Sequence, residues 1–197
     1  MTVHLSPGFS DPVRDQQRAF RVAMDALSRP ARIIRFVSQL SNQGSLCANS
    51  SALALTLLDF EVRYHLAPSL MSAESALTFH TGSIRVDRPD LADFAFLDLR
   101  QDPMRLDSFA QGVPNYPDRS TTLVVSCAAL TGGPEYSVRG PGISAIERLS
   151  VQGLPDDFAE QWVANSARMP LGVDVLFVSG NGVLGLPRST RLVGGAG

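Results

Sequence analysis

Apolar residues recur every three or four positions in several stretches of the chain, which is the spacing of an amphipathic helix. The first such stretch spans residues 12–28, where Asp11 is a suitable N-cap and Pro12 fits the first helical position. Its predicted buried face consists of Ala19, Phe20, Ala23, Met24 and Leu27. Further helices are predicted at residues 49–59, 69–78 and 154–169, the last with Asp156 as its cap.

Short runs rich in β-branched and aromatic residues lie between these helices and predict strands. The run at 121–130 is apolar throughout and indicates a central strand buried on both faces, with residues 135–140 as its hairpin partner. A proline-rich stretch at 112–120 predicts a loop. The other predicted strands lie at 31–40, 62–66, 94–97 and 173–178.

The alternation of these elements predicts the fold class and the domain organisation. We expect an α/β fold with three α/β/α layers and a mixed sheet that ends in antiparallel strands. The 197 residues and the 44% hydrophobic content suit one domain with a proper core. We place that domain at 12–191, with short termini at 1–11 and 192–197.

The stretch GNGVLG, residues 180–185, matches the spacing of a dinucleotide-binding fingerprint. The fingerprint requires a helix after its glycines and an acidic residue about 20 positions further on, and the remaining residues leave no room for them. Asn181-Gly182 is instead typical of a two-residue type I′ turn. We therefore predict a hairpin in which residues 183–186 form the returning strand, and no nucleotide site.

The composition excludes several classes of function. All 17 basic residues are arginine, and lysine is absent. Pyridoxal-phosphate enzymes need a lysine for the internal Schiff base, and Walker loops and protein kinases need one at the phosphates. These chemistries cannot operate here in their usual form.

Charge and hydropathy indicate the localisation of the protein and the kinds of partner it can bind. A formal net charge of -2 produces no field that attracts nucleic acid or an anionic membrane. The chain shows neither a signal-peptide pattern nor an apolar run of about 18 residues, the length that suggests a membrane span. We expect a cytoplasmic protein that binds neither nucleic acid nor membrane.

Metal-binding residues are few and scattered. Cys47 and Cys127 lie far apart, and the three histidines do not form a zinc-binding or catalytic pattern. We therefore expect no metal and no cofactor, and we expect both cysteines to be core thiols.

Five stretches together resemble a known family. They are FRVAMDALSRP (20–30), LTFHTG (77–82), TTLVVSCAALTGG (121–133), VRGPGI (138–143) and MPLGVDVLFVSGNGVLGLPRSTR (169–191). In this order they resemble the H subunit of the bacterial carbon-phosphorus lyase core complex, the PhnH family, and the last stretch is the most specific. Ala31 and Ser189 depart from the pattern, because that family usually has glycine and threonine there.

The resemblance implies a fold similar to the large domain of pyridoxal-phosphate-dependent transferases, without that cofactor. It also implies an accessory subunit that assembles with subunits G, I and J and forms a homodimer when isolated. In that assembly phosphonate displaces the adenine of ATP, giving ribose 1-phosphonate 5-triphosphate, and a radical S-adenosylmethionine subunit later cleaves the carbon-phosphorus bond. The alternative is a stand-alone phosphate-ligand-binding or transferase domain.

The candidate ligand residues follow the last predicted strand. Arg188, Arg191 and Ser189 offer guanidinium and hydroxyl donors for phosphate or phosphonate oxygens. Alternatively, the arginines pair with carboxylates at a subunit interface or with Asp174, which interrupts an apolar strand and needs a partner. We expect Arg188 to be the partner of Asp174.

The candidate acid or base is His80, which with Thr81 follows a predicted helix. The alternative for His80 is a structural role that satisfies carbonyl groups at the end of that helix. The sequence contains no self-contained catalytic set, so no catalytic residue is assigned beyond this candidate.

Overall fold

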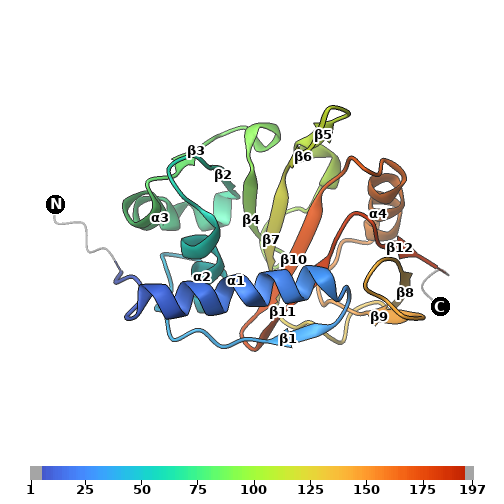
Figure 1. The fold of residues 1–197 in the computed structure, drawn as a ribbon, viewed down its shortest axis with the longest axis horizontal. Coiled ribbons are helices and arrows are strands. Elements are labelled where there is room, and N and C mark those ends of the chain that lie inside the picture. The colour runs from blue at the N-terminus through green and yellow to red at the C-terminus, as the bar shows by residue number, and fades with distance from the viewer. Residues whose placement is uncertain (1–5, 194–197) are drawn as a thin grey trace.

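The computed structural model describes residues 6–193 and is built around a mixed seven-stranded sheet (Figure 1). The strand order is β1-β11-β10-β7-β4-β2-β3, in which β3, β2, β4, β7 and β10 run parallel, and β11 runs antiparallel to both β10 and β1. The strands are β1 (Ile33–Arg35), β2 (Arg63–Leu66), β3 (Ile84–Arg85), β4 (Phe94–Asp98), β7 (Thr122–Ser126), β10 (Asp174–Ser179) and β11 (Gly182–Leu186). The predicted α/β class and the mixed sheet with an antiparallel end are confirmed.

Different elements cover the two faces of this sheet. One face packs against the helices α1 (Pro12–Ser28), α2 (Ala48–Leu57) and α3 (Glu74–Thr81). The other packs against α4 (Phe158–Ala167) and a smaller sheet of β8 (Tyr136–Arg139), β9 (Glu147–Leu149) and β12 (Arg191–Leu192). The remaining elements are η1 (Pro68–Ala73), η2 (Pro89–Leu91), η3 (Leu106–Ser108), β5 (Gln111–Val113) and β6 (Tyr116–Ser120). In the part of the chain that is described, no helix is both long and apolar enough to span a membrane.

Strand alternation explains why two separate hydrophobic clusters form. Successive side chains of a strand point to opposite faces. In β7, Val124 therefore packs with the α1–α3 layer, whereas Leu123 and Val125 pack with the α4 layer. All three side chains are at most 1% exposed, so the predicted burial of this strand on both faces is confirmed.

Helix α1 begins as predicted, but its buried face is different. The Asp11 side chain accepts a hydrogen bond from the amide of Arg14, and Pro12 begins the helix. Phe20 and Met24, predicted to be buried, are 49% and 52% exposed. The buried stripe consists of Ala19, Val22, Ala23 and Ala26. Because the helix lies close to β11, only small side chains fit between the two backbones.

Three predictions of local structure are wrong in the middle of the chain. The expected loop at 112–120 forms most of the β5–β6 hairpin, whose strands pair only with each other. The expected hairpin partner of β7 is instead β8, which pairs with β9 and β12 in the smaller sheet. The helix expected at 69–78 is divided into η1 and α3, and α3 extends to Thr81. Local composition does not encode these long-range pairings.

Smaller differences concern the caps and ends of elements. Helix α2 begins at Ala48, one residue before the predicted start, with Cys47 as its N-cap. The N-cap of α4 is Asp157 rather than the predicted Asp156. The strand expected at 121–130 ends at Ser126. Boundaries of this kind depend on tertiary packing more than on propensity.

The predicted closing hairpin is confirmed, with a shifted turn. Ser179 pairs with Gly182, so the two turn residues are Gly180 and Asn181, and neither has a positive φ. The predicted type I′ turn at Asn181-Gly182 is therefore wrong, because that turn needs a positive φ at both central residues. Gly185 is required by a close approach, because a Cβ atom there would lie 2.4 Å from the carbonyl oxygen of Ala26 in α1. The glycines of GNGVLG therefore serve backbone packing, and the antiparallel β11 excludes a dinucleotide fold at this position.

Ala31 lies in a backbone conformation that favours glycine. Its φ is 63°, in the left-handed region, and its amide donates a 3.0 Å hydrogen bond to the carbonyl of Gly185. A left-handed conformation is costly for residues with a Cβ atom. The turn between α1 and β1 therefore favours glycine over the alanine that this chain has at position 31.

We predict that Gly185→Ala destabilises the protein, because its new methyl group would collide with the backbone of α1. Overpacking of this kind costs about 1–3 kcal/mol in the free energy of unfolding. Gly180→Ala is the matched control, since a Cβ atom there meets nothing within 4 Å. Urea denaturation followed by circular dichroism measures both variants. Equal free energies of unfolding for the two variants would contradict the close approach.

Candidate functional site

The residues predicted as ligand contacts lie around the end of the closing hairpin, where Asp174 and Arg188 form an ion pair. Arg188 Nη2 lies 2.5 Å and Nε 3.2 Å from Asp174 Oδ2, and the Arg188 amide donates a 2.7 Å hydrogen bond to Oδ1. Both side chains are less than one-fifth exposed. The predicted pairing of Asp174 with Arg188 is confirmed.

The remaining donor capacity of Arg188 is also used within the protein. Its Nη1 atom donates to the carbonyl oxygens of Pro117, at 3.0 Å, and of Pro170, at 3.3 Å. Pro117 belongs to β6, and Pro170 precedes β10. Arg188 therefore connects three segments and acts as a structural residue, and we do not place it among the ligand contacts.

Ser189 and Arg191 follow Arg188 within three residues, but neither takes part in the ion pair with Asp174. They line an open pocket of about 450 Å³, which also contains Arg139 from the end of β8. Arg191 and Arg139 are direct partners in the antiparallel pairing of β12 and β8. The lining of the pocket thus includes two arginines and a serine.

His80 and Thr81 lie far from these arginines, since α3 and β12 occupy opposite ends of the molecule in Figure 1. His80 lies within the last turn of α3, not after it, and its Nε2 atom is 2.9 Å from the carbonyl oxygen of Ser6. The Thr81 hydroxyl donates to the Leu77 carbonyl at 2.7 Å. The contact of His80 holds the N-terminal segment and favours its structural alternative, and the Thr81 hydroxyl is engaged by the helix itself.

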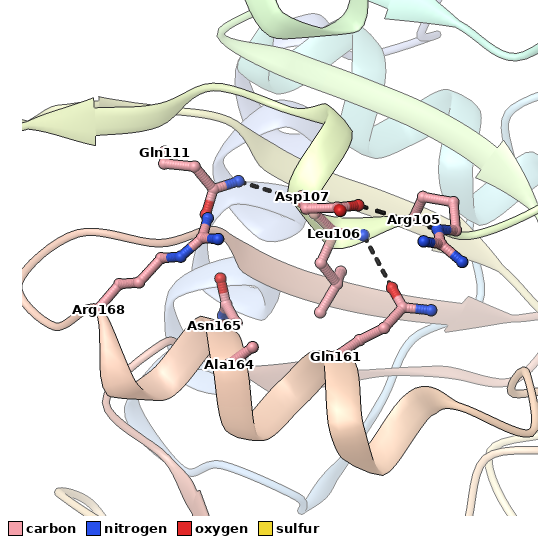
Figure 2. A pocket seen from close by; sticks show the side chains of 8 residues that line it. All are labelled: Arg105, Leu106, Asp107, Gln111, Gln161, Ala164, Asn165 and Arg168. Atoms are coloured by element: carbon pink, nitrogen blue, oxygen red, sulfur yellow. Dashed lines mark hydrogen bonds and ion pairs between the residues drawn. The ribbon is translucent and has the colours of Figure 1, made fainter.

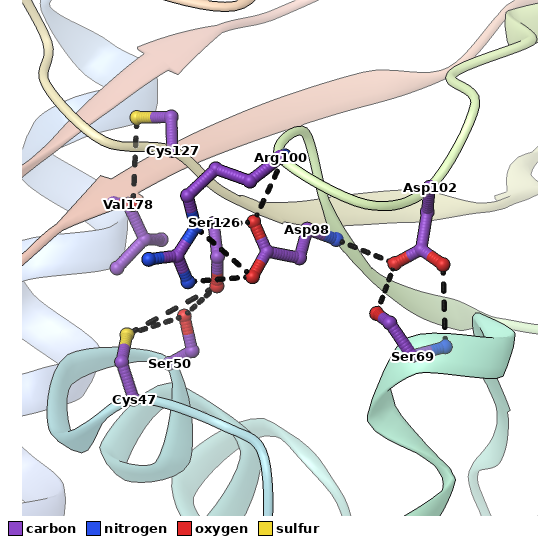
Figure 3. A network of polar contacts seen from close by, with 9 residues as sticks. All are labelled: Cys47, Ser50, Ser69, Asp98, Arg100, Asp102, Ser126, Cys127 and Val178. Carbon is purple, nitrogen blue, oxygen red and sulfur yellow. Dashed lines mark hydrogen bonds and ion pairs between the residues drawn. The ribbon is translucent and has the colours of Figure 1, made fainter.

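A polar network lies where the parallel strands end (Figure 3). The chain leaves β2 toward β3 and leaves β4 toward β7, on opposite sides of the β2–β4 pair. Open α/β sheets bind ligands at such a switch point. Here Asp98, the last residue of β4, pairs with Arg100 through Nε at 2.8 Å and Nη2 at 2.6 Å.

Further members of the network satisfy one another across the same edge. Asp102 accepts hydrogen bonds from the Asp98 amide, at 3.1 Å, and from the hydroxyl and amide of Ser69. The hydroxyls of Ser50, in α2, and Ser126, at the end of β7, are 2.8 Å apart. The two carboxylates of this network, Asp98 and Asp102, therefore accept hydrogen bonds from groups of the protein itself.

The electrostatics of this edge stabilise a charged Asp98 and a neutral Cys127. The hydrogen bond from Arg100 holds the pKa of Asp98 below its usual value, although burial acts in the opposite direction. Burial raises the pKa of the Cys127 thiol to about 12. Cys127 is a core thiol as predicted, whereas Cys47 is only half-buried at the start of α2.

A second, smaller pocket of about 110 Å³ lies between η3, β5 and α4 (Figure 2). Its amide side chains are held by the backbone: Gln161 binds the Leu106 amide at 2.9 Å and Asn165 binds the Val173 amide at 2.8 Å. These bonds fix α4 against the segments around it. We assign the pocket a structural role.

The described residues contain no group of three or more histidine, cysteine or acidic side chains that could hold a metal ion. The lysine that would anchor pyridoxal phosphate is absent from the whole chain. Nothing in the donor set therefore points to a particular cofactor.

Sequence reasoning missed Arg139 and the network around Asp98. Arg139 lies in the VRGPGI stretch, and its pairing with Arg191 depends on the smaller sheet, which the sequence did not predict. The sequence does contain an indication for Asp98, because this acidic residue ends an apolar strand, just as Asp174 begins one. A carboxylate in such a position needs a buried partner.

We predict that the Asp98–Arg100 pair makes stability depend on pH in the acidic range. A carboxyl group whose pKa is lowered by folding stabilises the protein above its unfolded-state pKa of about 3.9 and loses this contribution as the pH falls through the folded-state pKa. Urea unfolding between pH 7 and pH 2.5 should show a smaller loss of stability with acid for Asp98→Asn than for the wild type. Identical pH dependence would contradict this role.

Comparisons with known proteins agree with the resemblance seen in the sequence. The family model described as bacterial phosphonate metabolism protein (PhnH) matches residues 7–193. The PhnH subunit of alpha-D-ribose 1-methylphosphonate 5-triphosphate synthase from Rhizobium meliloti is 41% identical over 189 residues, covering 95% of this chain and 94% of that protein. The putative C-P lyase subunit protein HtxG from Stutzerimonas stutzeri is 29% identical over 180 residues, covering 90% and 85%. The chain therefore belongs to the PhnH family of bacterial phosphonate metabolism proteins.

Proposed function

We propose that this chain is an accessory subunit of a carbon-phosphorus lyase core complex. In that complex it supports the transfer of phosphonate to the ribose C1 of ATP, with release of adenine and formation of ribose 1-phosphonate 5-triphosphate. Its partners are the G, I and J subunits, and it acts in the cytoplasm. The observation that carries this proposal is the 41% identity, across almost the full length of both chains, to a subunit of the synthase named for that product.

The state of the acid and base groups supports an accessory role. At the switch point of the sheet, Asp98 is paired with Arg100, and Asp102 accepts hydrogen bonds from Ser69. His80 holds the backbone of Ser6. A general base must be within reach of the proton that it removes and free to accept it. The candidates named here are engaged in structural contacts, which favours catalysis by partner subunits.

We further propose that the fold resembles the large domain of pyridoxal-phosphate-dependent transferases. The mixed, mainly parallel sheet between layers of helices supports this relation. The absence of lysine supports a role in which this framework no longer binds the cofactor. A framework of this kind can carry subunit interfaces in place of the original chemistry.

The alternative is a stand-alone domain that binds a small phosphate ligand or acts as a transferase. The pocket with Arg139 and Arg191 favours it, because arginine forks are suited to phosphate oxygens. The two functions differ in what remains bound to the protein inside the cell. Stable recovery with the other subunits supports the accessory role.

We predict that the tagged protein, purified from its host grown with a phosphonate as sole phosphorus source, retains the G, I and J subunits in matched amounts. Mass spectrometry of the eluate measures their ratios. The matched control is the same tag on an unrelated protein expressed in the same cells. Recovery of the tagged chain without these subunits would contradict the proposal and favour the stand-alone domain.

We also propose that the isolated chain is a homodimer, for which α1 and β1 provide a suitable face. Phe20 and Met24 are about half exposed on α1, the helix that packs beside β11 and β1. The strand β1 lies at the edge of the sheet, so one side of its backbone is unpaired within the described chain. Apolar surface beside an open strand edge favours pairing with a second copy around a twofold axis.

The homodimer is tested by analytical ultracentrifugation of the wild type and of the double variant Phe20→Glu/Met24→Glu. The wild type should sediment as a dimer at micromolar concentration, and the double variant as a monomer, because two charges cannot be buried at the interface. Phe60→Glu is the control, since Phe60 is 72% exposed but lies outside this face. A monomeric wild type, or an unchanged dimer in the double variant, would contradict the assignment.

A further inference from the structure

The open pocket beside the smaller sheet brings together three stretches that are distant in the sequence. Its volume of about 450 Å³ falls within the range of about 300–1,000 Å³ typical of small-molecule sites. The pocket is formed by the end of β8 with the loop after it, by Met169 before β10, and by the segment that enters β12. The lining residues are Arg139, Gly140, Pro141, Met169, Ser189, Arg191 and Val193.

The two arginines of this pocket repel each other in the structure as it stands. Arg139 and Arg191 are paired directly across the antiparallel strands β8 and β12, which places their side chains on the same face. Like charges in this position destabilise a sheet. Neither guanidinium forms an ion pair with a carboxylate of residues 6–193, and the pocket lining contains no acidic residue.

The backbone that carries these arginines is fixed by contacts on both sides. A Cβ atom on Gly140 would lie 3.0 Å from the carbonyl oxygen of Ser189, so the two segments pack backbone against backbone. The buried Trp162 of α4 donates a 2.9 Å hydrogen bond to the carbonyl of Thr190. The Asp174–Arg188 pair holds the chain immediately before Ser189. The pocket is therefore preorganised, which lowers the entropic cost of binding.

We propose that this pocket binds the oxyanion of a phosphate, phosphonate or triphosphate group through Arg139, Arg191 and Ser189. Two guanidinium forks match the geometry of such oxygens, and an anion between them removes the repulsion across the strands. The inference of a binding site depends on the pocket alone. Its assignment to the phosphonate or to the triphosphate of the complex's reaction rests on the proposed function.

The test is isothermal titration calorimetry of the purified full-length chain with three probes: inorganic phosphate, methylphosphonate and tripolyphosphate. We expect one site per chain for at least one probe at 150 mM salt. The double variant Arg139→Gln/Arg191→Gln should weaken binding at least tenfold. Arg148→Gln is the control, since it removes one positive charge from β9 of the same small sheet, outside the pocket lining, and should leave the affinity within about twofold.

Each outcome of this titration supports or overturns the proposal. Tightest binding of tripolyphosphate would assign the pocket to the nucleotide's polyphosphate, and tightest binding of methylphosphonate would assign it to the phosphonate. No binding of any probe at millimolar concentration would overturn the site, and the arginines would then be contacts for a partner's carboxylates. Equal losses in the double variant and in Arg148→Gln would overturn it as well, because general surface charge would explain them. Thermal unfolding verifies that each variant is folded.

Since binding is measured on the chain alone, its result is independent of whether the G, I and J subunits are recovered with the protein. If the chain binds an anion but is recovered without the G, I and J subunits, the pocket proposal stands and the proposed complex membership is wrong. If the chain is recovered with those subunits but binds no anion, the subunit role stands and the pocket proposal is wrong. The two proposals therefore fail separately.

Discussion

The ion pair between Asp174 and Arg188 organises the C-terminal half of this protein. It joins the first residue of β10 to the segment that leaves β11, and Arg188 also reaches carbonyl groups before β10 and in β6. Removing one partner of a largely buried pair is expensive, about 3–5 kcal/mol, because the remaining charge has no solvent to stabilise it. The pair therefore fixes the position from which Ser189 and Arg191 continue into the pocket. One arginine is used for structure, and the next one along the chain stays available for an anion.

The two faces of the central sheet have different functions in this account. The α1–α3 face buries small residues of α1 against β11 and leaves Phe20 and Met24 on the outside, which suits assembly. The opposite face carries α4 and the smaller sheet, whose β8 and β12 form the arginine pocket. The carboxyl edge of the parallel strands, where such sheets commonly bind ligands, is closed by its own polar network.

Features determined by nearby residues could be predicted from the sequence, whereas features determined by distant contacts could not. The Asp11 cap, the strand at β7, the closing hairpin and the partner of Asp174 follow from local patterns or from a single unpaired carboxylate. The exposed Phe20 could not be predicted, because α1 is drawn close to β11 by Gly185, more than 150 positions away. The pairing of Arg139 with Arg191 depends on a three-stranded sheet assembled from separate parts of the chain. The stretches that carry the family resemblance contain Arg139, Arg188 and Arg191, but only the structure shows how Arg188 is held by Asp174 and by two backbone carbonyls.

The central claim is that the chain supports a reaction carried out by its partners, and the reaction itself provides the most direct measurement. The purified partner subunits are incubated with ATP and methylphosphonate, and the released adenine is quantified with and without this chain. We predict that adenine release depends on adding the chain and that the chain alone releases none. An unchanged rate in its absence, or full activity of the isolated chain, would contradict the account.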